Sequence, residues 1–273
     1  MNLPCLRHRP PSSAPLRVAP LVAIALLSLC AVEGRSQTVS VTVRDGVTRA
    51  DDFHAELRIQ EALESLRGAL QSDSTRFDAL WRAARETVNL GMLATEDSEA
   101  RDWYAASVDF AERAVRSAPD AAQGYQWLSI ALGRQALLEG PRTKVRLAVE
   151  VRENALLAVQ IDSTAAGAHN VLGEWHAEIQ RLGGLARFSA ERLLGADTFR
   201  LASWEEAVRH LTHAVELEPD ALIHRLALAR VYLDLDRPAD AKTQLTRAVE
   251  LPTLQPTDPV SRREAEELLR RIR

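Results

Sequence analysis

The sequence predicts an all-α fold in which pairs of helices repeat along the chain. Over Ser203–Pro252, small and large apolar residues recur at helical spacing as Ala207, Leu211 and Ala214, and the same order returns 34 residues later from Ala241. Glycine and aromatic residues are sparse, at 12 glycines and 5% aromatic residues, which favours helices over strands. The chain has 273 residues, 46% of them hydrophobic, and can therefore bury a continuous core.

This order is typical of the tetratricopeptide repeat, a unit of two antiparallel helices and about 34 residues. Small residues let its two helices approach closely, and large residues fill the groove between them. The residues equivalent to Ala214 are Ala69, Ala114, Ala158 and Ala248, so the intervals along the chain are 45, 44, 56 and 34 residues. The longer intervals indicate insertions of 11, 10 and 22 residues. We therefore predict a tetratricopeptide-like helical-repeat solenoid with insertions.

The N-terminal 36 residues have the features of a secretory signal peptide. Residues 18–32 form an uncharged apolar stretch of the length of a signal-peptide core, which is short for a membrane span. Small residues before Gln37 place the cleavage site there. We expect an exported protein, periplasmic or secreted, with an uncleaved N-terminal anchor and an organellar transit peptide as alternatives. The basic residues ahead of the apolar stretch are Arg7, Arg9 and Arg17.

Both cysteines, Cys5 and Cys30, lie in this segment. Residues 37–273 therefore carry no thiol for a disulfide, a nucleophile or a zinc site. Removal of residues 1–36 leaves 30 basic and 37 acidic residues, a net charge of −7. An acidic surface argues against nucleic acid and against anionic lipid as main partners.

The remaining elements can be placed in order. We expect residues 37–50 to form an extended tail, because Gln37–Val47 alternates apolar and polar residues with no second strand signal nearby. Residues 51–257 form the predicted repeat domain, with a loop at Thr95–Glu99. Asp258–Arg273 starts with Asp-Pro, a favourable helix start, and is predicted to cap the last repeat. The repeat helices are predicted around Ala62–Ala69, Phe77–Gly91, Ser107–Ala114, Gln123–Leu138, Val145–Asp162, Ala165–Leu182, Ala207–Ala214, Leu228–Tyr232 and Ala241–Ala248.

The insertion at residues 183–202 is richer in large apolar residues than its flanks. One interpretation is an extra helix that covers the solenoid core. The other is a lid over the groove of the solenoid, or a contact with a membrane surface. The residues that would form the lid are Leu185, Phe188, Leu193, Leu194 and Phe199.

The first helix of each repeat lines the concave surface of this architecture. Amide, arginine and apolar side chains are mixed along it, which suits an extended peptide whose backbone needs hydrogen-bond partners and whose side chains need pockets. We therefore predict that a protein or peptide binds there. The candidate groove residues are Trp81, Arg85, Gln123, Gln126, Asn170, Glu174, Leu226 and Arg230.

Three segments of the repeat domain have a distinctive order and spacing. They are WRAAR at Trp81–Arg85, AHNVLGEW at Ala168–Trp175, and SWEEAVRHLTHAVELEP at Ser203–Pro219 after a 22-residue insertion. Together they resemble the regulator of microtubule dynamics family, over roughly residues 55–252. The resemblance implies a helical-repeat adaptor and, in eukaryotic members, association with microtubules and organelle membranes. This sequence resembles a secreted relative of bacterial type instead, and tubulin's acidic tails would need a basic face, so we carry over the fold and the adaptor role but not microtubule binding.

Motifs of enzymes and of cofactor-binding proteins are missing from the sequence. It contains no nucleophile elbow, phosphate-binding glycine loop, HExxH or paired CxxC motif, and its carboxylates form no recognisable dyad. We predict a non-enzymatic protein without catalytic, cofactor or metal-binding residues.

The histidines of the repeat domain are the strongest candidates for a metal site. His169 and His176 lie seven residues apart on one helix face, but both fall at packing positions of the repeat. His210 and His213 lie one turn apart and could join His224 across a turn. Since no carboxylate or cysteine completes an obvious set, we expect these three to be solvated or capping histidines.

The leading hypothesis from the sequence is thus a secreted or periplasmic adaptor that binds a protein or peptide in its groove. The alternative is a carrier of an apolar ligand such as a lipid, with residues 185–201 as its lid. A passive scaffold that only dimerises is the third hypothesis.

Overall fold

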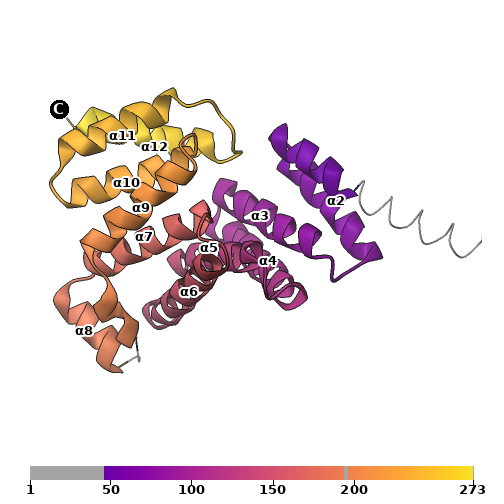
Figure 1. The fold of residues 1–273 in the computed structure, drawn as a ribbon, viewed down its shortest axis with the longest axis horizontal. Coiled ribbons are helices and arrows are strands. Elements are labelled where there is room, and N and C mark those ends of the chain that lie inside the picture. Colours follow the sequence, from indigo (N-terminus) through magenta and orange to yellow (C-terminus); the bar gives the residue numbers. More distant parts are fainter. Residues whose placement is uncertain (1–45, 194–195, 273) are drawn as a thin grey trace, which may run out of the picture. The chain divides into compact units, whose positions relative to one another are not determined.

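The computed structural model describes residues 46–193 and 196–272, and the regular structure of this part of the chain is entirely helical (Figure 1). This confirms the predicted all-α class. The described residues all belong to one compact unit of the chain. The predicted signal peptide and the predicted lid residue Leu194 lie outside the described residues. No helix within the described ranges is long and apolar enough to cross a membrane.

The first described helix covers residues 46–55, and short turns join most of the helices that follow. The elements after it are α2 (Ile59–Ser72), α3 (Phe77–Leu93), α4 (Asp97–Ser117), α5 (Ala122–Leu137), α6 (Pro141–Ile161), α7 (Ala166–Arg181), α8 (Gly184–Leu193), the 3-10 helix η1 (Asp197–Leu201), α9 (Trp204–Leu217), α10 (Leu222–Asp234), α11 (Pro238–Glu250) and α12 (Asp258–Arg271).

Neighbouring helices pack in pairs, α3 with α4, α5 with α6, α7 with α9 and α10 with α11. The first helices of these pairs also contact one another in series, from α3 through α5 and α7 to α10, and α10 contacts α12. We call α3, α5, α7 and α10 the A helices, and α2, α4, α6, α9 and α11 the B helices. The B helices α4, α6 and α9 each contact the A helix of the next pair as well. Helix pairs stacked in this way form a tetratricopeptide-like solenoid, as predicted.

The five alanines of the predicted register end the B helices. Each is at most 4% exposed, which the close packing of the helix pairs requires. Each carbonyl oxygen also accepts the backbone N–H that closes the last turn of its helix, at 2.9 to 3.4 Å. The donor and acceptor residues are Asp73 and Ala69, Ala118 and Ala114, Asp162 and Ala158, Glu218 and Ala214, and Leu251 and Ala248.

Gly173 marks the closest approach of α7 and α9. A Cβ atom added there would lie 2.4 Å from Cγ of Leu211 and 3.0 Å from the carbonyl oxygen of Ala207. Only a residue without a side chain leaves room for Leu211, which is fully buried between the two helices. The 22-residue insertion therefore leaves α7 and α9 packed as an ordinary repeat pair.

The insertion forms α8 and η1, and its two parts differ in burial. Phe199 in η1 is 1% exposed and packs edge-to-face on Trp175 of α7, with ring centroids 6.0 Å apart. Its assignment to a lid is therefore wrong, because its ring fills the core beside α7. In α8, which ends at Leu193, Leu185 is 81% exposed and Phe188 is 57% exposed. These two side chains remain available for a contact.

Three predicted boundaries differ from the structure. Residues 46–50 belong to the first described helix and not to an extended tail. Helix α4 begins inside the predicted loop, at Asp97, because Asp97 and Glu99 place negative charge in its first turn. Helix α6 begins at Pro141, before the predicted Val145, because proline suits the first turn of a helix.

The contact at Gly173 can be tested with two glycine variants. Gly173→Ala should lower the free energy of unfolding by about 1–3 kcal/mol, because the added methyl group overpacks the contact with α9. Gly68→Ala is the control, since nothing lies within 4 Å of a Cβ atom added at this exposed position of α2. That change should raise the free energy of unfolding by about 0.5–1 kcal/mol. Urea denaturation measures both, and equal stability of the two variants would contradict the close approach.

Candidate functional site

The exposed and half-buried side chains of the A helices, which we call the A-helix face, carry ion pairs between successive repeats. Arg230 of α10 lies between two carboxylates. Its Nη1 atom is 3.5 Å from Oε1 of Glu174 in α7, and its Nε atom donates to Oε1 of Glu264 in α12 at 2.7 Å. Arg181 of α7 similarly donates to Asp234 of α10 at 2.9 Å. These pairs join α7 to α10 and α10 to α12.

A second group of ion pairs joins the helix at residues 46–55 to α3. Nε of Arg82 donates to Oδ1 of Asp51 at 2.8 Å, and Nη2 of Arg85 reaches the same oxygen at 3.4 Å. Burial raises the pKa of Asp51, but hydrogen bonds and charge from the two arginines outweigh it and lower that pKa below its usual value. The guanidinium groups of Arg82 and Arg85 also lie 4.2 and 5.5 Å from the ring centre of Trp81.

Glu86 of α3 is a buried carboxylate that sequence reasoning missed. It is completely buried, and its Oε1 atom accepts from Nε of Arg85 at 2.7 Å and lies 2.9 Å from Nδ1 of His54. The sequence shows that Glu86 is acidic, but it does not show that Arg85 and His54 bind it.

Two ion pairs of the A helices, Arg85 with Asp51 and Arg230 with Glu264, join residues that are 34 positions apart in the sequence, one repeat length. Opposite charges at that spacing are the signal that would have found them.

The middle of the A-helix face, on α5 and α7, is formed by amides. Asn170 is 7% exposed, and its Nδ2 atom donates to Glu174 at 3.3 Å. Its Oδ1 atom is buried and has no hydrogen-bond partner among the described residues. Gln126 packs against Gly167 of α7, where an added Cβ atom would lie 2.9 Å from its amide carbon, and Gln123 is exposed. The part of the A-helix face on α5 and α7 therefore carries amide side chains, and it lies between the ion pairs of α3 and those of α10.

One predicted groove residue does not belong to this face. Leu226 is fully buried in a cluster with Ala265 of α12 and with residues of α10 and α11. Its assignment is wrong because α12 packs against α10 and covers this position. The other seven lie on the A helices as exposed, half-buried or, for Asn170, nearly buried side chains.

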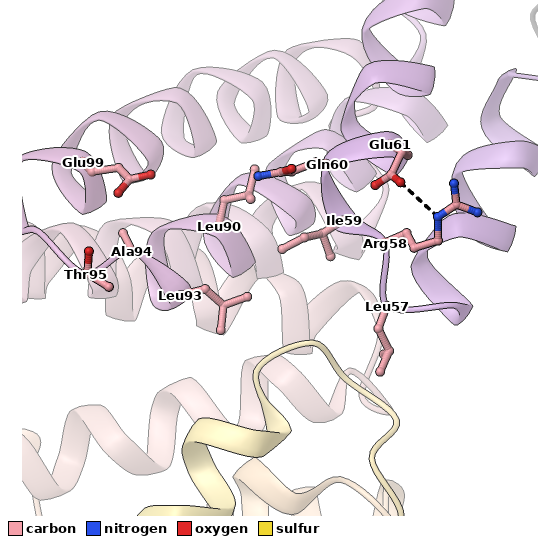
Figure 2. Close-up of a pocket in the computed structure, with 10 residues that line it drawn as sticks. All are labelled: Leu57, Arg58, Ile59, Gln60, Glu61, Leu90, Leu93, Ala94, Thr95 and Glu99. Carbon is pink, nitrogen blue, oxygen red and sulfur yellow. Dashed lines mark hydrogen bonds and ion pairs between the residues drawn. The ribbon is translucent and has the colours of Figure 1, made fainter.

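A pocket of about 460 Å³ lies where the turn before α2 meets the end of α3 and the start of α4 (Figure 2). Leu57, whose backbone is left-handed at a φ of 62°, Ile59 and Leu93 give it apolar walls. Glu61 and Glu99 lie at its edge, and Glu61 pairs with Arg58 at 3.0 Å. Polar and apolar groups line it in about equal measure, and it is built from turns and helix ends.

The histidines of α7 and α9 form a hydrogen-bonded chain. Nε2 of His169 donates to the carbonyl oxygen of Ser163 at 3.1 Å, so its Nδ1 atom accepts from Nδ1 of His210 at 2.9 Å. Nε2 of His210 in turn accepts from Nη2 of Arg209 at 3.0 Å. Nδ1 of His176 accepts from the backbone N–H of Ser203 at 3.2 Å.

The packing predicted for His169 and His176 is confirmed, since both are 5% exposed. The prediction of solvated or capping histidines is wrong for His210, which α7 covers and leaves 6% exposed, and for His224, which is 4% exposed. His213 is half-buried beside His169, and His224 is buried with its Nε2 atom 3.1 Å from Glu218. Burial lowers the pKa of His176 to about 4 and that of His210 to about 3, so both rings are neutral at pH 7.

This cluster makes stability depend on pH. Both histidines have a folded-state pKa below the value of about 6.5 of an unfolded chain, so below pH 6.5 the unfolded state binds more protons. The contribution of the two neutral histidines to the free energy of unfolding is complete above pH 6.5. It is lost as the pH falls toward their pKa values in the folded state. The loss is at most about 1.4 kcal/mol per pH unit for each histidine. Urea unfolding at pH 7 and pH 5 measures it in a window above the usual pKa of carboxyl groups.

His210→Gln should unfold with a smaller difference between the two pH values than the wild-type chain. His213→Gln, which changes the half-exposed histidine of the same helix, is the control and should keep the wild-type difference. An unchanged pH difference in His210→Gln would show that the buried ring does not control stability.

The comparison with known sequences identifies relatives along most of the chain. The profile of the regulator of microtubule dynamics protein 1-3 family matches residues 47–273. Regulator of microtubule dynamics protein 3 of Rattus norvegicus is 25% identical over 223 residues, which cover 81% of this chain and 47% of the relative. The protein of the same name from Xenopus laevis is 27% identical over 191 residues, covering 70% of this chain and 41% of the relative. The chain thus spans about half the length of these relatives.

The comparison with solved structures concerns the fold. A thermophilic TPR protein of Thermus thermophilus, TTC0263, superimposes with a TM-score of 0.59 at 22% sequence identity, covering 83% of this chain and 98% of that protein. This likeness shows a tetratricopeptide-like architecture. Together with the profile match, it identifies the chain as a member of the regulator of microtubule dynamics family with a tetratricopeptide-like helical-repeat fold.

Proposed function

We propose that the chain is a non-enzymatic adaptor that binds an extended segment of a partner protein along the A-helix face. The fold supports this, because its A helices contact one another in series and align their side chains along one surface. The matched relatives are named as regulators, and a solved tetratricopeptide protein shares this type of fold. The observation that carries the proposal is the unpaired amide oxygen of Asn170.

The Oδ1 atom of Asn170 is buried and lacks a hydrogen-bond partner among the described residues. Leaving a buried acceptor unpaired costs about 1–3 kcal/mol, so such groups are rare unless a ligand supplies the donor. The backbone N–H of an extended segment is a donor of the right kind, and the neighbouring amides of Gln123 and Gln126 can bind further backbone groups. A partner that lies over α5 and α7 would satisfy the acceptor that the protein itself does not.

Charge indicates the chemistry of the partner segment. Residues 37–273 carry a net charge of −7, and two partly exposed carboxylates flank Arg230: Glu174 on the A-helix face and Glu264 on the adjoining helix α12. A basic segment complements this charge, whereas the acidic tails of tubulin would be repelled by it. The relatives are named for microtubule dynamics, but the segment proposed here is basic and extended.

Peptides selected on the purified chain from a random display library test the proposal. Asn170→Ala should weaken the dissociation constant of a selected peptide at least about tenfold, since it removes the acceptor at the centre of the face. Stability should change by less than about 1 kcal/mol, because the lost acceptor is unpaired in the free protein.

Asn154→Ala is the matched control, since Asn154 lies on the B helix α6 and its Nδ2 atom donates to the carbonyl oxygen of Glu150 in the same helix. This variant should bind the peptide like the wild type. Selected peptides that bind Asn170→Ala and the wild type equally well would refute the assignment of the A-helix face.

A contact of α8 with an apolar ligand such as a lipid is a second candidate function. Leu185 and Phe188 are three residues apart on α8, so they share one face of the helix, and both are more than half exposed. Exposed large apolar side chains at this spacing suit the surface of a membrane or an apolar ligand.

Flotation with vesicles of phosphatidylcholine tests this second candidate. The wild-type chain should float with the vesicles, and a chain with both Leu185→Ser and Phe188→Ser should not, because binding scales with the apolar area that enters the lipid. Leu137→Ser changes a leucine of α5 that is 57% exposed, the same fraction as Phe188, and should still float. Equal flotation of all three proteins, or of none, would exclude a specific role for α8.

A further inference from the structure

We propose that His176, Glu206 and His210 form a binding site for a first-row divalent metal ion, for which Zn²⁺ is the best match, and that the bound ion links α7 to α9. The three side chains each offer one ligand atom, and these atoms all lie within 4.8 Å of one another. Two imidazoles and one carboxylate are a ligand set that zinc accepts in proteins, with one coordination position left for water.

The helix contact already described brings the ligands together. His176 lies on α7, one turn after Gly173, whose missing side chain lets α9 approach. His210 follows Glu206 by four residues on α9, so the two share one face of that helix. The rings of His176 and His210 are stacked, with centroids 5.9 Å apart and an angle of 17° between their planes. The sequence alone paired His176 with His169, and only the packing of α9 reveals the other two ligands.

A cation already bridges two of the three ligands. Nη2 of Arg209 donates to Oε2 of Glu206 at 2.5 Å and to Nε2 of His210 at 3.0 Å. The lone pair of Nε2 and the carboxylate oxygen therefore point toward one positive group. Arg209 is exposed and can turn into solvent, and a divalent ion at the same place would replace one positive group by another of higher charge.

A chain of hydrogen bonds through His169 to Ser163 holds His210 in the tautomer that a metal ion needs. Nδ1–H of His210 donates to Nδ1 of His169, and Nε2–H of His169 donates to the carbonyl oxygen of Ser163. This chain fixes Nε2 of His210 as the nitrogen with the free lone pair, as the outer shell of metal-binding histidines commonly does.

Two adjustments accompany binding. Zinc ligands in a tetrahedral site lie about 3.3 Å from one another, so the three atoms must close by about 1.5 Å at most. His176 also presents its Nδ1 atom to the backbone N–H of Ser203, and binding exchanges this hydrogen bond for the metal bond or turns the ring by half a turn. The side chain of Glu206 is 38% exposed, which gives an ion a path from solvent to the two buried rings.

Zinc titration of the metal-free full chain by calorimetry tests the site. The wild-type chain should bind one Zn²⁺ ion with saturation, and Co²⁺ in its place should give the intense visible absorption of a four-coordinate ion. Glu206→Gln should weaken binding at least about tenfold, because it removes one ligand without burying a new group. Arg209→Met should strengthen binding, because the competing guanidinium group is gone.

Control variants separate this site from casual binding by surface histidines. His213→Gln and Glu216→Gln change a neighbouring pair on the same helix, with Nδ1 and Oε2 3.3 Å apart, and should bind zinc like the wild type. His176→Gln should bind as weakly as Glu206→Gln, and circular dichroism shows whether it folds. The proposal is overturned if the wild-type chain shows no saturable binding, or if Glu206→Gln and Arg209→Met bind zinc with the wild-type affinity.

Discussion

The close contact between α7 and α9 is the constraint on which the rest of this structure depends. It rests on Gly173, which leaves room for the fully buried side chain of Leu211. The contact is made although 22 residues are inserted between the two helices. The inserted residues form α8 and η1, and the chain then continues into α9, which packs against α7. It brings His176 beside His210 and keeps the later repeats, through α10, in contact with α7. A larger residue at this point would separate two helices that the inserted segment does not itself hold together.

Polar groups of α7 determine where the chain re-enters the repeat after the insertion. Nε2 of Gln180 donates to the carbonyl oxygen of Ala202, and His176 accepts the N–H of the next residue, Ser203. The hydroxyl group of Ser203 then caps α9 by accepting the N–H of Glu206. These three bonds set the first residue of α9, while Phe199 fills the core immediately before it. The insertion is therefore fixed at its C-terminal end and exposes Leu185 and Phe188 on α8 and Leu201 at the end of η1.

The sequence was sufficient to predict the fold because the information needed is local. Small residues at helical spacing, followed by turns, identify the B helices, and the carbonyl groups of Ala69 and Ala214 end them as the register requires. The ion pairs of the A-helix face were not predicted, because they depend on how each A helix is rotated about its axis, and the 34-residue spacing of Arg85 with Asp51 and of Arg230 with Glu264 is a weaker signal. Phe199 was misplaced for a related reason, since an amphipathic insertion looks the same whether its apolar side packs inward or faces a ligand. His210 needed the position of α7, which no single-helix pattern contains.

Arg85 and Arg230, the two arginines predicted for the A-helix face, differ in what a partner could do with them. Arg85 is bound to Glu86, which is completely buried, and removing one member of a buried charge pair costs about 3–5 kcal/mol. Arg230 bridges Glu174 and Glu264, the three side chains being 32%, 34% and 42% exposed, and such pairs contribute only about 0–1 kcal/mol each. A bound segment can therefore displace the carboxylates from Arg230 at little cost, but it cannot separate Arg85 from Glu86. Of the residues predicted from the repeat register, Arg230 can thus release its carboxylates to a partner of the proposed kind, whereas Arg85 mainly holds α3 to the helix before α2.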